Sequence, residues 1–112
     1  MTEDSFASLE IAPAEVKQQL DRGEKLFFVD VRESWEHQLC HIEGSKLIPL
    51  GQIPASLQEF EAADSVILFC HSGRRSLDAA TWLRSQGIAG ARSMTGGIDR
   101  WSQEIDPRVP RY

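Results

Sequence analysis

One cysteine in this chain stands where a reactive thiolate could form. A short apolar run carries it into a cationic, glycine-containing segment, which reads Val66-Ile67-Leu68-Phe69-Cys70-His71-Ser72-Gly73-Arg74-Arg75-Ser76. A cysteine is nucleophilic as its thiolate, which positive charge, free backbone N–H groups and the start of a helix all favour. Arg74 and Arg75 supply the charge, and a helical pattern begins near Ser76. The segment predicts a nucleophilic Cys70.

The alternative for Cys70 is a structural role as a small buried hydrophobe at the end of a strand. The residues after it favour the reactive role, because Gly73 permits a tight turn and the arginines and amide groups around it form an anion cradle. We assign Cys70 as the catalytic residue. The residues expected to bind an anionic substrate are His71, Ser72, Gly73, Arg74 and Arg75.

Length and composition indicate one folded domain. The chain has 112 residues, of which 41% are hydrophobic and 26% charged, the balance of an ordinary globular protein. Residues 1–10 are polar and unpatterned, and we expect a flexible leader there. Residues 11–112 then form the single domain.

The charge balance disfavours nucleic acid and anionic membranes as partners. Twelve Lys and Arg residues against seventeen Asp and Glu residues give a net charge of −5, so the cationic segment is local and suits a small anion. No apolar run is long enough to cross a bilayer, and Met1-Thr2-Glu3-Asp4 is acidic where a signal peptide is basic. We expect a cytoplasmic protein.

The apolar segments alternate with helical patterns, which predicts an α/β fold with an open, mostly parallel sheet of four to five strands and helices on both faces. The expected strands cover residues 26–31, 46–50, 65–70 and 91–95, and the expected helices cover residues 13–22, 33–39, 54–61, 76–86 and 97–103.

Parallel strands place their carboxyl ends, and the ligand site, along one edge of the sheet. Cys70 ends one expected strand, and Asp30 and Arg32 end another, so these residues should meet. Asp30 and Arg32 could form a strand-end ion pair or take part in the site directly. Cys40 precedes a strand, which places it toward the opposite edge, about 15 Å away for a strand of about five residues. A Cys40–Cys70 disulfide is therefore disfavoured, and both thiols are expected to be free.

Three motifs in the same order resemble the rhodanese family over about residues 11–112. Its catalytic loop reads Cys-x-x-Gly-x-(Arg/Thr/Ser), as Cys70 to Arg75 does. Its entrance and closing signatures are similar to Asp30-Val31-Arg32-Glu33 with Glu36 and His41-Ile42-Glu43-Gly44-Ser45, and to Gly96-Gly97-Ile98 with Trp101. Cys40 and Glu43 depart from the family, which usually has Gly and often has Pro there.

This resemblance implies a sulfurtransferase in which Cys70 carries a persulfide, thiosulfate or another persulfide is the donor, and a thiol or cyanide is the acceptor. It implies no metal and no organic cofactor. Asp30 and Arg32 would shape the mouth of the site, and Ser76 would support the loop. Relatives that act on phosphate or arsenate place Arg six positions after Cys, where this chain has Ser76. The loop thus disfavours an arsenate reductase or a phosphatase.

A second function stays open, in which the domain relays sulfur to or from a protein partner. Residues 105–112 resemble the end of rhodanese domains fused to enzymes that activate ubiquitin-like sulfur carriers. Trp35 follows the strand-end residues and could form an exposed apolar rim for such a partner, whereas Trp82 and Trp101 are expected to pack.

A metal site at His37, Cys40 and His41 is disfavoured because no fourth ligand is nearby. We expect His41 to hydrogen-bond the backbone instead.

Overall fold

The computed structural model describes residues 8–112, so residues 1–7 of the expected leader lie outside it. The described residues form a wholly parallel five-stranded sheet in the order β1-β5-β4-β2-β3. Its strands are β1 (Glu10–Ile11), β2 (Phe27–Asp30), β3 (Lys46–Leu47), β4 (Val66–Phe69) and β5 (Ala91–Met94). The predicted fold class is confirmed.

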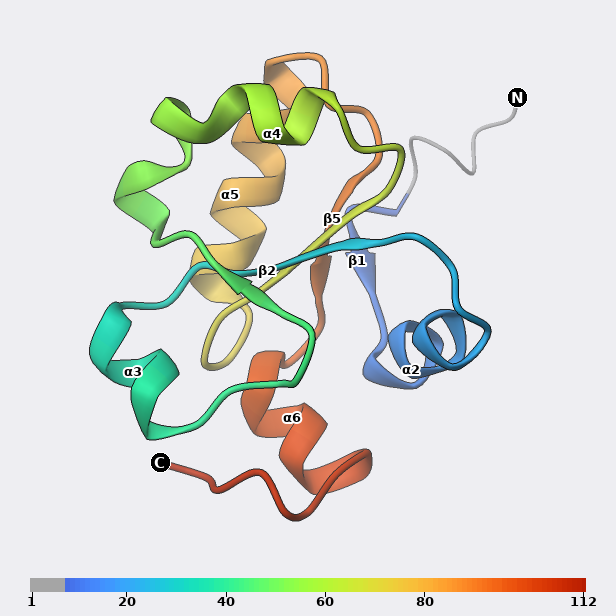
Figure 1. Cartoon of the computed structure of the whole chain (residues 1–112), viewed down its shortest axis with the longest axis vertical. Helices are drawn as coiled ribbons and strands as arrows, with labels where there is room; N and C mark the ends of the chain where they lie inside the picture. The colour runs from blue at the N-terminus through green and yellow to red at the C-terminus, as the bar shows by residue number, and fades with distance from the viewer. Residues whose placement is uncertain (1–7) are drawn as a thin grey trace.

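Helices cover both faces of the sheet (Figure 1). They are α2 (Pro13–Asp21), α3 (Ser34–Leu39), α4 (Leu57–Glu61), α5 (Arg74–Ser85) and α6 (Gly97–Glu104), with 3-10 turns at Leu50–Gln52 and Pro54–Ser56. Helices α4 and α5 pack on one face, and α2 and α6 on the other. The short α3 follows the carboxyl end of β2, and the chain ends beside it.

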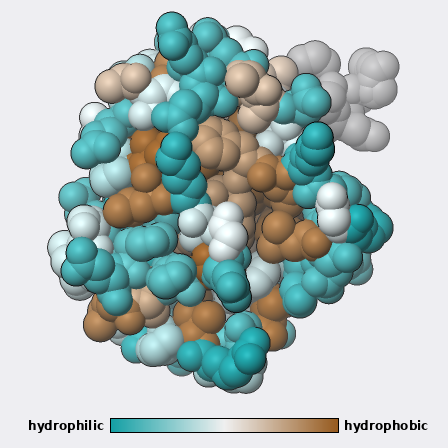
Figure 2. Space-filling view, viewed as in Figure 1, coloured by the Kyte–Doolittle hydropathy of each residue, from teal (hydrophilic) through white to brown (hydrophobic). Residues whose placement is uncertain are grey.

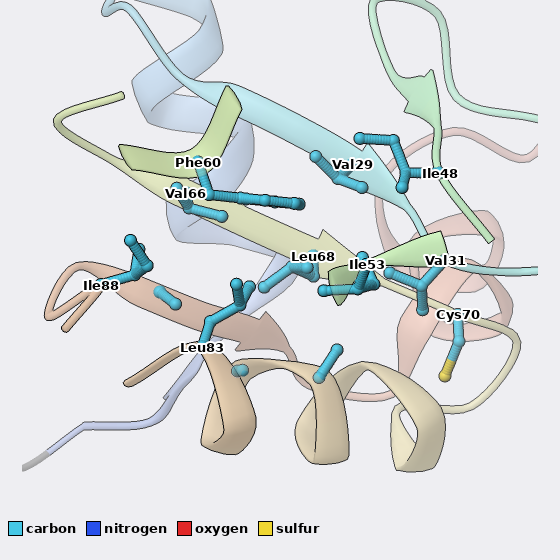
Figure 3. Close-up of a cluster of buried hydrophobic side chains, with 13 residues drawn as sticks. Val29, Val31, Ile48, Ile53, Phe60, Val66, Leu68, Cys70, Leu83 and Ile88 are labelled. Atoms are coloured by element: carbon cyan, nitrogen blue, oxygen red, sulfur yellow. The ribbon is translucent and has the colours of Figure 1, made fainter. Parts of the chain in front are cut away.

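The central strand β4 lies between β5 and β2, and the helices on the two sides of the sheet bury both of its faces. Successive side chains of a strand point to opposite faces. Accordingly, Val66, Leu68 and Cys70 belong to the core under α4 and α5, while Ile67 and Phe69 belong to the core under α2 and α6. Figure 3 shows Cys70 at the end of this row, with its sulfur pointing toward the first turn of α5.

Two predicted helices begin two or three residues away from the expected position. Helix α5 begins at Arg74 rather than at residue 76, because Gly73 has a positive φ of 107° and its carbonyl accepts the N–H of Leu77, so it caps the helix. The predicted helix over residues 54–61 divides into a 3-10 turn and the shorter α4. Arg74 and Arg75 thus belong to the first helical turn and not to the loop.

The largest differences among the strands concern β3 and β1. The strand expected over residues 46–50 is shorter, because the chain enters a 3-10 turn at Leu50, directly after Pro49. Glu10 was expected to belong to the leader, but it lies in β1, which pairs with β5 and adds the fifth strand.

Hydrophilic residues cover most of the face seen in Figure 2, and hydrophobic residues form separate patches among them. Of the large hydrophobic side chains that the structure describes, Trp35 and Leu39 are the exposed ones. Trp101 is buried and Trp82 packs partly buried against the core, as predicted. Within residues 8–112 no helix has the length and apolarity that a bilayer span requires.

Candidate active site

Cys70 directly follows β4, and its thiol is almost fully buried, with 1% of the residue exposed. Three hydrogen-bond donors converge on its sulfur. They are the backbone N–H of Gly73 at 3.1 Å, the backbone N–H of Ser76 at 3.4 Å and the hydroxyl of Ser76 at 3.5 Å. Donors of this kind stabilise negative charge on sulfur. The backbone of Gly73 and both the backbone and the side chain of Ser76 therefore surround the sulfur with hydrogen-bond donors.

The first turn of helix α6 hydrogen-bonds the backbone of the loop that follows Cys70. The N–H groups of Ile98 and Asp99 donate to the carbonyl oxygens of Cys70 and His71, at 2.9 and 3.0 Å. Gly97 makes this approach possible, since a Cβ there would lie only 2.4 Å from the Cys70 carbonyl oxygen. The carbonyl oxygens of Cys70 and His71 thus bond to α6, while the N–H groups of Gly73 and Ser76 donate to the sulfur.

The side chains of the two residues after Cys70 point away from its sulfur. The His71 ring is partly exposed and stacks on the ring of Tyr112, and Ser72 is exposed. Within residues 8–112, neither side chain hydrogen-bonds the sulfur of Cys70. Their predicted role in binding substrate stays a prediction.

The two arginines of the α5 first turn differ in their surroundings. Arg75 makes a two-pronged ion pair with Glu36, with N–O distances of 2.7 and 3.0 Å, and this contact raises the pKa of Arg75. Arg74 is exposed and forms no hydrogen bond or ion pair with any described residue. The expectation that both arginines are available to an anion is corrected for Arg75, whose charge is balanced by a carboxylate from α3.

Glu36 connects this arginine to the entrance motif. Its carboxylate also accepts the N–H of Glu33, which completes a capping box at the start of α3, and the hydroxyl of Tyr112 at 2.7 Å. The hydrogen bond from Arg75 is the main reason why the pKa of Glu36 is lowered to about 2. Glu36 therefore stays ionised and fixes α3 against α5 and the C-terminal segment.

Asp30 and Arg32 form a fully buried ion pair, with N–O distances of 2.9 and 2.8 Å. Arg32 also donates to the Tyr112 hydroxyl at 3.0 Å, and Asp30 contacts His37 Nδ1 at 2.8 Å. Burial raises the pKa of Tyr112 to about 12, so its hydroxyl stays protonated and donates to Glu36. The strand-end pair thus reaches the catalytic loop through Tyr112 and Glu36.

Cys40 lies closer to this network than expected. An N–H of Arg32 lies 3.9 Å from its sulfur, and another donates to its carbonyl oxygen at 2.6 Å. The expectation that Cys40 lies toward the opposite edge is wrong, because β3 pairs with Val29 and Asp30 at the carboxyl end of β2, so the chain need not return to the amino end of the sheet. Both cysteines are free thiols, as predicted.

The prediction that His41 hydrogen-bonds the backbone is confirmed. His41 Nδ1 contacts the backbone oxygen of His37 at 3.2 Å. In the described part of the chain, no group of three or more His, Cys, Asp or Glu side chains could hold a metal ion.

Sequence reasoning gave no role to three residues of the site. Glu36 and Tyr112 were noticed only as parts of motifs, and their contacts join residues far apart in sequence. Ser93, a buried polar residue of β5, hydrogen-bonds Ser76 at 2.7 Å. Its one signal in the sequence was its position. Ser93 lies two residues after Ala91 in the predicted strand, so the two side chains point to the same face of the sheet.

The site and the fold define a class of α/β protein with a cysteine cradle at the carboxyl edge of a parallel sheet. The family model "Rhodanese-like domain" matches residues 12–104, so the chain belongs to the rhodanese-like family.

Among curated relatives, a putative sulfur carrier protein, YrkF, of Bacillus subtilis is 35% identical over 94% of this chain. The probable adenylyltransferase/sulfurtransferase MoeZ of Mycobacterium tuberculosis is 33% identical over 91% of it. The chain spans 57% and 26% of the lengths of these two relatives.

Among solved structures, the human single-domain sulfurtransferase TSTD1 superposes with a TM-score of 0.77 and 26% identity. The match covers 88% of this chain and 98% of that one. A rhodanese-like domain protein from Staphylococcus aureus has a TM-score of 0.78 and 29% identity, over 92% and 97% of the two chains.

Proposed function

We propose that this protein transfers sulfane sulfur from thiosulfate or a persulfide donor to a thiol or cyanide acceptor, through a persulfide on Cys70. The observation that carries the proposal is the convergence of three donors, from Gly73 and Ser76, on the sulfur of Cys70. The family of the chain and its sulfurtransferase relatives support the same reaction class.

In the first step the Cys70 thiolate attacks the outer sulfur of thiosulfate. A sulfur–sulfur bond forms to Cys70, the original sulfur–sulfur bond breaks, and sulfite leaves with the bonding electron pair. In the second step a thiolate or cyanide attacks the outer sulfur of the persulfide. The electron pair of the broken bond returns to the Cys70 sulfur, which regenerates the thiolate.

The protein supplies positioning and electrostatic stabilisation to both steps. The amides of Gly73 and Ser76 stabilise negative charge on the Cys70 sulfur when it attacks and when it leaves. Arg74, exposed at the start of α5, attracts the anionic donor, while Arg75 keeps the helix fixed to Glu36. The bond chemistry requires no metal or organic cofactor.

Intact-mass spectrometry of thiosulfate-treated protein tests this proposal. We expect a gain of one sulfur atom, removed by cyanide with formation of thiocyanate. Cys70→Ser abolishes the gain and the thiocyanate, while Cys40→Ser retains most of both and serves as the matched control. Equal losses in the two variants would contradict the assignment of Cys70 as the single sulfur carrier.

A second candidate function is a relay that passes the Cys70 sulfur to a protein. Exposed apolar side chains on α3 favour it: Trp35 is 62% and Leu39 52% exposed, and the Trp35 ring lies edge-on to Tyr112, beside the loop. A Trp35→Ala variant distinguishes the candidates. In a relay the substitution slows transfer to a protein acceptor and spares transfer to a small thiol. If it changes both rates by the same factor, the relay is contradicted.

A further inference from the structure

Two buried serines form a pair of hydroxyl groups beneath the Cys70 sulfur. Ser76 comes from the first turns of α5 and Ser93 from the neighbouring strand β5, and neither is exposed to solvent. Their oxygens are 2.7 Å apart, the shortest contact that either hydroxyl makes. Ser76 alone reaches the sulfur, at 3.5 Å.

The number of protons limits what the pair can do. Each hydroxyl has one proton to donate. The acceptors within reach of Ser76 are the sulfur at 3.5 Å, the Gly73 carbonyl oxygen at 3.3 Å and the Ser93 hydroxyl. Ser93 can donate to Ser76 or to the same carbonyl at 3.5 Å. If Ser76 donates to Ser93, it has no proton left for the sulfur.

We propose that Ser93 is a positioning residue, which donates to Ser76 and so directs the Ser76 proton to the sulfur of Cys70 whenever that sulfur is negatively charged. When the sulfur is neutral, the pair reverses: Ser76 donates to Ser93, and Ser93 donates to the Gly73 carbonyl. Its role in sulfur transfer rests on the proposed function, but its effect on the thiolate does not.

The reversal fits the charges of the catalytic cycle. The Cys70 sulfur is negative before it attacks the donor, and it becomes the neutral inner atom of a persulfide afterwards. It regains a negative charge when the acceptor removes the outer sulfur. A donor that turns toward the sulfur at these two moments stabilises both the nucleophile and the leaving group without moving a heavy atom.

The test is the pH profile of Cys70 alkylation by iodoacetamide, followed on the Cys70 peptide so that Cys40 does not interfere. Without Ser93, Ser76 loses the donor that orients it and can give its proton to the Gly73 carbonyl, which lies nearer than the sulfur. We therefore expect Ser93→Ala to slow alkylation at neutral pH about three- to tenfold, the value of one ordinary hydrogen bond. The profile moves to higher pH, while its alkaline plateau, which reports reagent access, is unchanged. Ser45→Ala, which removes a half-buried hydroxyl that donates to the Ile42 carbonyl, keeps the wild-type profile.

The double variant Ser76→Ala/Ser93→Ala shows whether Ser93 acts through Ser76. We expect it to react no more slowly than Ser76→Ala alone, because Ser93 then has no partner to orient. A wild-type profile for Ser93→Ala, or multiplied effects in the double variant, would overturn the proposal. If Ser93→Ala does not fold, the isosteric pair Ser93→Thr and Ser93→Val makes the same comparison, with the hydroxyl present only in the first.

Alkylation requires no sulfur donor, so this test is independent of the proposed function. If the wild-type protein gains no sulfur from thiosulfate but Ser93→Ala shows the shifted profile, sulfur transfer is refuted and the role of Ser93 is kept. The opposite pair of results refutes the role of Ser93 alone.

Discussion

The ring of Tyr112 stacks on the imidazole of His71, with 4.1 Å between the ring centroids and 15° between the ring planes. His71 directly follows the catalytic cysteine, so the C-terminal segment packs on the loop that holds the sulfur. The Tyr112 hydroxyl meanwhile contacts Glu36 and Arg32. One side chain therefore joins the entrance motif to the catalytic loop.

Two substitutions separate the two contributions of Tyr112. Tyr112→Phe keeps the stacked ring but removes the hydroxyl from Glu36 and Arg32, and we expect it to lower the free energy of unfolding by about 1–2 kcal/mol. Tyr112→Ala removes the stack as well, which costs roughly another 1 kcal/mol and speeds amide hydrogen exchange at the loop. Urea unfolding and hydrogen exchange measure both effects. Equal stability of the two variants would mean that the stack contributes nothing.

The two arginines of α5 should have different kinetic signatures. Arg74→Ala is expected to raise KM for thiosulfate about three- to tenfold with little change in kcat, because an exposed charge stabilises the bound donor and the transition state alike. Lys25→Ala removes an exposed positive charge just before β2, at the other end of the sheet, and should leave KM unchanged. A reduced kcat for Arg74→Ala at saturating donor would assign Arg74 to the chemical step instead.

Arg75→Ala should act mainly on stability. It leaves the Glu36 carboxylate, whose side chain is 5% exposed, without its cationic partner. Because Arg75 itself is partly solvated, we expect a loss of about 1–3 kcal/mol in the free energy of unfolding. Thermal and urea unfolding check this value, and an unchanged stability would show that the pair is not a structural link.

The ion pair also predicts a pH dependence of stability. The pKa of Glu36 is lowered from its ordinary 4.5 to about 2, so its contribution is complete above about pH 4.5 and is lost as the pH falls toward 2. The shift corresponds to roughly 3 kcal/mol. Urea unfolding of Glu36→Gln should therefore show a shallower loss of stability between neutral pH and about pH 3. Parallel curves for the wild type and the variant would contradict this assignment.

Gly97 should tolerate no side chain. Ala at this position would need a positive φ of 61° and would place Cβ 2.4 and 2.5 Å from the carbonyl oxygens of Cys70 and His71. We expect Gly97→Ala to cost about 2–4 kcal/mol in unfolding free energy and to abolish persulfide formation.

Gly44→Ala is the matched control for that clash. Gly44 also has a positive φ, of 91°, but within residues 8–112 no group other than its chain neighbours would lie within 4 Å of a Cβ there. Gly44→Ala therefore loses only the free energy that a positive φ costs an alanine, about 1 kcal/mol, and should keep persulfide formation. If the two variants lose equal stability, contact with the catalytic loop is not what restricts residue 97.

Local patterns were sufficient to predict the sheet and the place of Cys70. An apolar run that ends in a cysteine and is followed by Gly73 predicts a strand, a turn and a helix, because burial and backbone freedom act over a few residues. The start of α5 was misplaced by two residues because the arginines carry no apolar periodicity, although they occupy its first turn.

The partners of the loop were beyond sequence reasoning. Arg75 binds Glu36, 39 positions away, and Tyr112 binds Glu36 across 76 positions. Such contacts depend on how short α3 is and on where the C-terminal segment crosses the sheet edge, which local propensity does not determine. The charge of Arg75 therefore looked available to a substrate when read from its neighbours in the sequence.

The long-range contacts of Glu36 have a consequence for folding kinetics. Contacts between residues far apart in sequence form slowly, because a large loop must close before they stabilise the chain. The turn from Cys70 to Ser76 is local and can form early, whereas its link through Arg75 and Glu36 to Tyr112 closes last. A refolding chain would thus place the donors of Gly73 and Ser76 around the Cys70 sulfur before Tyr112 packs on the loop that holds them.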